Sequence, residues 1–143
     1  MTTVLHIPAR PDAAIACDMS TAQDTPAERL ADYARLFERA LTGRERRDDG
    51  VVLTFSRDAR EDVEDLVRRE AACCSFVDYR VDLSGGDVVW TTTNPRRGDD
   101  RADADVILDA LYELPDHAGA GLDGYFERLA ERGREAHGRH PAR

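Results

Sequence analysis

The chain has 143 residues, 41% of them apolar, and a formal net charge of −9 at pH 7, which suits a single domain with its own core. The acidity argues against nucleic acid as a partner, because phosphate binding needs clustered positive charge. The absence of lysine excludes Schiff-base chemistry and a P-loop. No apolar run approaches the roughly 20 residues that cross a bilayer, and residues 1–10 have no charged start and no small-residue cleavage site, unlike a signal peptide, so we expect a cytoplasmic protein without membrane contacts.

The N-terminal third is expected to hold an arm, a short strand and a helix. Residues 1–13 carry two prolines and few apolar side chains, which is typical of a loosely held arm. Residues 14–17 predict a short buried strand. Residues 25–28, Thr-Pro-Ala-Glu, form a capping box with proline at the first helical position. Apolar residues at helical spacing follow, and Gly43 predicts the end of this helix.

The middle of the chain predicts three strands and a second helix. Residues 51–55 are an apolar strand, and a helix beginning near Asp58 runs directly into Cys73 and Cys74. Strict alternation of apolar and polar residues over 77–83 predicts a half-buried strand. The Ser-Gly-Gly-Asp sequence that follows is a hairpin signal, which leads to a partner strand over 88–93.

The last third is expected to be helical. A third helix begins at Asp103 or Asp105 and stops at Pro115, and a fourth runs over 122–132. The element order predicts an α+β fold, a small and mostly antiparallel sheet with helices packed on one face. The expected organisation is an arm (1–13), a cysteine-containing domain (14–114) and a C-terminal helical appendage with a basic tail (115–143).

The neighbouring cysteines Cys73 and Cys74 are the most distinctive chemical feature of the sequence. A reducing cytosol keeps thiols free, so the odd count of three cysteines favours a metal or redox role over a disulfide framework. Thiolates suit soft ions such as Hg(II), Cu(I), Zn(II) or As(III). Cys17 supplies a third thiolate if its strand pairs antiparallel with the strand at 77–83, and is excluded if the pairing is parallel. The alternative is that the cysteines only fill the core.

A resemblance adds to this interpretation. Residues 69–76, Arg-Glu-Ala-Ala-Cys-Cys-Ser-Phe, together with Cys17, resemble a small actinobacterial module with a Cys-Cys-x-Phe motif. The module occurs alone or attached to regulators of the mercury-resistance (MerR) type. The similarity covers roughly residues 13–114 and implies heavy-metal or metalloid handling, with Cys17, Cys73 and Cys74 as candidate ligands. This chain lacks the DNA-binding segment of the regulators.

An enzyme is the second hypothesis. An organomercurial-lyase-like enzyme needs two thiols to take the metal and an acid to protonate the departing carbon. Asp18 follows Cys17, and Asp78 follows the cysteine pair by four residues, so both are candidate acids. The position of the pair at a helix C-terminus opposes this, because the partial negative charge there disfavours a thiolate.

The sequence therefore leaves three functions open. The leading hypothesis is a binding protein whose thiolates capture a soft metal or metalloid ion or another small thiophilic ligand. The others are the cysteine-dependent enzyme and a structural module with inert cysteines that forms a homodimer through the hairpin edge or the fourth helix.

Overall fold

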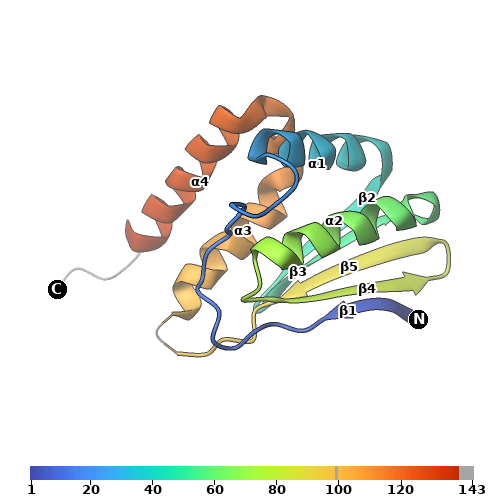
Figure 1. Cartoon of the computed structure of the whole chain (residues 1–143), viewed down its shortest axis with the longest axis horizontal. Coiled ribbons are helices and arrows are strands. Elements are labelled where there is room, and N and C mark those ends of the chain that lie inside the picture. The colour runs from blue at the N-terminus through green and yellow to red at the C-terminus, as the bar shows by residue number, and fades with distance from the viewer. Residues whose placement is uncertain (99, 139–143) are drawn as a thin grey trace.

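The computed structural model describes residues 1–98 and 100–138, and it shows an α+β fold (Figure 1). Five strands form one antiparallel sheet in the order β1-β4-β5-β3-β2. The elements in chain order are β1 (Thr2–Ile7), α1 (Pro26–Ala40), β2 (Leu41–Arg47), β3 (Gly50–Ser56), a short 3-10 turn (Arg57–Ala59), α2 (Arg60–Cys73), β4 (Asp78–Ser84), β5 (Asp87–Thr93), α3 (Arg101–His117), a second 3-10 turn (Ala118–Ala120) and α4 (Gly121–Gly138).

The core lies between the sheet and the helices that cover one of its faces (Figure 1). Leu5, Val81, Trp90 and Leu53 lie side by side across β1, β4, β5 and β3. Trp90 is 1% exposed and its ring stacks on Tyr33 of α1 at a centroid distance of 6.1 Å. The alternation of β4 and β5 thus buries one row of side chains under the helices, as the sequence pattern predicts.

The structure contains two strands, β1 and β2, in segments for which the sequence predicted an arm and the end of a helix. The expected arm at 1–13 contains β1, which pairs with β4 at the edge of the sheet. The expected strand at 14–17 is wrong, because those residues form part of the loop between β1 and α1. The other edge is β2, which begins directly after α1 and contains Gly43, so α1 ends three residues earlier than expected.

The C-terminal boundary also differs from the prediction. α3 begins at Arg101 and continues to His117, so Pro115 lies inside the helix instead of stopping it. Proline removes one N–H donor from the helix, and α3 ends two residues later, at His117. α4 packs against α3 and α1, and it extends past the predicted end at residue 132. Over the described residues, no helix is both long enough and apolar enough to cross a membrane.

The capping box at the start of α1 gives a direct test of this local structure. The Thr25 hydroxyl accepts a hydrogen bond from the Glu28 N–H at 3.1 Å, and the Thr25 N–H donates to Glu28 Oε1 at 2.9 Å. We expect Thr25→Ala to lower the free energy of unfolding by about 1 kcal/mol in urea titrations, the usual contribution of such a cap. Thr21→Ala in the exposed loop should change it by less than about 0.5 kcal/mol, and equal effects of the two substitutions would contradict the prediction.

Candidate thiol site

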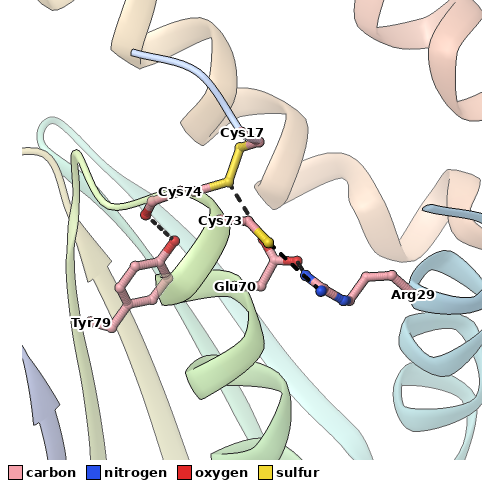
Figure 2. Close-up of a disulfide and its surroundings, with 6 residues drawn as sticks. All are labelled: Cys17, Arg29, Glu70, Cys73, Cys74 and Tyr79. Atoms are coloured by element: carbon pink, nitrogen blue, oxygen red, sulfur yellow. Dashed lines mark hydrogen bonds and ion pairs between the residues drawn. A yellow bond between two sulfur atoms is a disulfide. The ribbon is translucent and has the colours of Figure 1, made fainter. Parts of the chain in front are cut away.

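Cys17 and Cys74 are brought together by the loop that connects β1 to α1. The Asp18 N–H donates to the Cys73 carbonyl oxygen at 3.0 Å, and the Arg10 N–H donates to the Ser75 carbonyl oxygen at 2.8 Å. These two bonds fasten the loop along the end of α2. The Cα atoms of Cys17 and Cys74 lie 4.4 Å apart and their sulfur atoms form a disulfide (Figure 2).

This arrangement differs from the sequence expectation in two ways. The expected partner of the Cys74 region was an antiparallel strand ending at Cys17, whereas Cys17 belongs to a loop. The sequence also predicted three reduced thiols, whereas the structure contains one disulfide and one free cysteine, Cys73. The backbone bonds between the loop and α2 explain both differences, since they hold the two cysteines at disulfide distance.

Cys73 and Cys74 lie where α2 ends, as predicted. Cys73 is the last helical residue and Cys74 is the cap, whose N–H donates to the Glu70 carbonyl oxygen at 2.7 Å. The Tyr79 hydroxyl donates to the Cys74 carbonyl oxygen at 2.9 Å and so ties the cap to β4. Burial raises the pKa of Tyr79 well above its ordinary value, with the negative charge of Glu70 as the next cause, so this hydroxyl stays a donor.

An arginine on α1 organises the charges beside the sulfurs. The buried Arg29 guanidinium donates to both carboxylate oxygens of Asp24, at 2.6 and 2.7 Å, and to Glu70 Oε1 at 2.8 Å. Its Nη2 atom also lies 3.8 Å from the sulfur of Cys73 (Figure 2). Cys73 therefore faces the arginine, whereas Cys74 faces Cys17.

Glu70 places a carboxylate beside the disulfide. Its Oε2 atom lies 3.9 Å from the Cys74 sulfur. Burial raises the pKa of Glu70, and the bonds from Arg29 oppose that rise. Asp24 behaves in the opposite way, because the bonds from Arg29 hold its pKa far below its ordinary value of 3.8. The site thus pairs one fully ionised carboxylate with one carboxyl that takes up a proton more readily than usual.

The candidate acids Asp18 and Asp78 do not contact the sulfurs in the described part of the chain. The Asp18 carboxylate accepts a hydrogen bond from the Ser20 N–H at 2.9 Å. The Asp78 carboxylate lies 3.0 Å from His6 Nε2, on the neighbouring strand β1. Among the described residues there is also no group of three or more His, Cys, Asp or Glu side chains placed to hold a metal ion.

Sequence reasoning missed Arg29 and Glu70. The signal for Glu70 was its spacing, three and four residues before the cysteine pair on one helix, which places it on the same helical face. Arg29 carries no such signal, because its partners Glu70 and Cys73 lie 41 and 44 residues away in sequence.

A cavity of about 610 Å³ opens beside the disulfide. Cys17 and Cys74 lie on its wall together with Glu70 and Arg29. Most of the remaining wall is apolar. It comes from α1, β5, α3, α4 and the connection between α2 and β4, and it includes Leu30, Phe76, Trp90, Ile107, Leu111 and Phe126. The volume is in the range of small-molecule binding sites.

Comparison with known proteins returns nothing for this chain: no family model, no curated protein and no solved structure matches it. The resemblance to the Cys-Cys-x-Phe module therefore stays a prediction.

The charge network predicts a specific dependence of stability on pH. Because the pKa of Asp24 is lowered in the folded state, its stabilising effect is present above pH 3.8 and is lost as the pH falls. We expect the wild-type free energy of unfolding to decrease between about pH 5 and 2 by up to about 1.4 kcal/mol per pH unit from this group. Asp24→Asn should be less stable at neutral pH and show a flatter profile in urea titrations. Parallel profiles would contradict the assignment.

Proposed function

We propose that the reduced chain binds a thiophilic metal or metalloid ion through Cys17 and Cys74. The observation that carries this proposal is the convergence of two sulfurs from residues separated by 57 positions. Two thiolates with bonds of about 2.3 Å to one ion lie at most about 4.6 Å apart. Cysteines that reach disulfide distance satisfy this limit with small side-chain rotations, and soft ions prefer such ligands.

The surroundings of the pair favour capture of an ion from solution. Cys17 is on an exposed loop, whereas Cys74 is 4% exposed and fixed at the end of α2. One ligand is therefore accessible and the other is held in place. Metal binding requires thiols to lose protons, and Glu70 lies 3.9 Å from the Cys74 sulfur as a proton acceptor with a raised pKa.

Cys73 is not a ligand in this proposal. The sequence predicted it as a third ligand, and its sulfur lies beside Arg29. We assign it no ligand role, and the variants below distinguish a site with two thiolates from a site with three. The proposed protein is a binding protein that buffers the ion or passes it on, with the disulfide as the form that cannot bind.

Native mass spectrometry of the reduced protein, titrated with Hg(II), As(III), Cu(I) and Zn(II), tests the proposal. We expect one ion per chain for at least one of these, with proton release detected in weakly buffered solution. Cys17→Ser and Cys74→Ser should each abolish tight binding. Both variants should keep the fold under reducing conditions, where the wild type also has no disulfide.

The matched control is Cys73→Ser, which removes the neighbouring thiol and leaves the converging pair. Retained binding in this control indicates a two-thiolate site, and its loss indicates three thiolates. The oxidised wild type should not bind the ion. Undiminished 1:1 binding by Cys17→Ser and Cys74→Ser would overturn the proposed function.

A further inference from the structure

The cavity beside the thiol pair carries information about the ligand. Its wall includes Cys17 and Cys74, and apolar side chains from the sheet, α1 and α3 make up most of the rest. A bare metal ion needs no such space. A ligand that joins a thiophilic atom to an apolar group would use both parts of the site.

The number of converging sulfurs indicates which class of arsenic(III) compound the site can bind. Trivalent arsenic forms three single bonds and keeps one lone pair, so inorganic As(III) is fully ligated by three thiolates. The structure brings two sulfurs together, whereas the third faces Arg29 at 3.8 Å. A monoorganyl arsenic(III) compound already has one bond to carbon, so two thiolates complete its coordination.

We propose that this chain binds monoorganyl arsenic(III) compounds, with arsenic on Cys17 and Cys74 and the organic group in the cavity. The proposal rests on the proposed function, because it needs the reduced thiol pair as the ligand set. It adds the chemical class of the ligand, and it assigns the apolar cavity as the binding site of the organic group.

The binding step is a condensation without any change of oxidation state. A monoorganyl arsonous acid, R–As(OH)2, reacts with the two thiols, so that two As–S bonds form and two As–O bonds break. The two thiol protons leave with the two hydroxyl groups as two molecules of water. The As–C bond stays intact, and no oxidant, reductant or further reactant is needed.

The wall of the cavity suits the organic group more than a second polar substituent. Trp90 and Phe76 are at most 1% exposed, and Ile107 and Leu111 line the same space from α3. The two charged side chains of the wall are paired with each other, since the Arg29 guanidinium donates to Glu70 and also to Asp24. An aromatic ring on arsenic therefore gains burial without displacing an ion pair.

Calorimetric titration of the reduced full-length chain with inorganic arsenite, methylarsonous acid and phenylarsonous acid tests this inference. We expect one molecule bound per chain and an affinity that rises in that order. The phenyl compound should bind about 30-fold more tightly than arsenite, which corresponds to about 2 kcal/mol. This series needs no variant and so does not depend on the folding of one.

Two alanines on α3 give a matched pair of variants. Ala110 lines the cavity and Ala102 is exposed on the same helix. Ala110→Phe should fill the cavity and reduce the preference for the phenyl compound at least about ten-fold, whereas Ala102→Phe should keep the wild-type preference. Cys73→Ser should also keep it, because arsenic then has all three bonds.

The outcomes separate this inference from the proposed function. Equal affinity for arsenite and the phenyl compound overturns the inference and leaves the thiol site in place. Loss of phenylarsonous acid binding in Cys73→Ser also overturns it, because a third sulfur would then be needed. No binding of any arsenical or soft ion overturns both. A preference for the phenyl compound that disappears in Ala110→Phe and persists in Ala102→Phe supports the inference.

Discussion

Replacing Arg29 by alanine is expected to lower the free energy of unfolding by about 2–4 kcal/mol. The Arg29 side chain is 5% exposed and ion-paired with both Asp24 and Glu70. Removing one partner of a buried ion pair costs about 3–5 kcal/mol, because the remaining charges are left without compensation. The two carboxylates are 16% and 21% exposed, so water offsets part of that cost. Urea titration at pH 7 measures the change.

Arg35 on the same helix provides the control. Its side chain is 71% exposed and pairs with Asp32, so Arg35→Ala should change the free energy of unfolding by less than about 0.5 kcal/mol. A loss below about 1 kcal/mol for Arg29→Ala would show that the charge network near Cys73 is not held together by this arginine.

Reduction of the Cys17–Cys74 disulfide is expected to lower the free energy of unfolding by about 2–4 kcal/mol. The bond joins residues 57 positions apart, so it removes many conformations from the unfolded chain. Urea titrations of the oxidised and reduced protein, with thiols counted in each sample, measure the difference.

Cysteine variants test whether the stability lost on reduction comes from the Cys17–Cys74 disulfide. The stability of Cys17→Ser should not respond to reductant, whereas Cys73→Ser should respond as the wild type does. Coincident unfolding curves for the oxidised and reduced wild type would contradict the prediction. Since the same sulfurs form the proposed ion site, a bound ion should restore part of the stability lost on reduction.

The elements with strong local signals were predictable from the sequence. The capping box at Thr25 begins α1, and the Gly-containing turn after Ser84 joins β4 to β5 with a positive φ of 60° at Gly85. The alternation over β4 buries Tyr79 and Val81 as expected. In each case residues close in sequence determine the conformation, so no knowledge of distant partners was needed.

The two edge strands were not predictable in this way. β2 contains Arg44, Glu45, Arg46 and Arg47 in its seven residues, which gives no apolar alternation. Its side chains are instead stabilised from α3, for example by the bonds of Arg44 to Asp116 at 3.0 Å. An edge strand with charged side chains is common, but its partners lie far away in sequence.

The site was predictable only in part, for the same reason. The position of the cysteine pair at the end of a helix follows from local patterns. The approach of Cys17 depends on a loop whose bonds reach Cys73 and Ser75, and these partners carry no sequence signal because they use backbone atoms. Arg29 joins the site through α1, whose packing against α2 is decided by the whole core.

The strand order has a consequence for the synthesis of the chain on the ribosome. β5 is the central strand, yet it is the last strand to be made. Synthesis of the β2–β3 hairpin is complete at Ser56. At about 5–20 residues per second, the end of β5 at Thr93 is synthesised about 2–7 s later. During that time β3 has an unpaired edge that another chain can reach. A nascent chain that stalls before β5 therefore carries two separate halves of a sheet, and a single further segment of seven residues joins them.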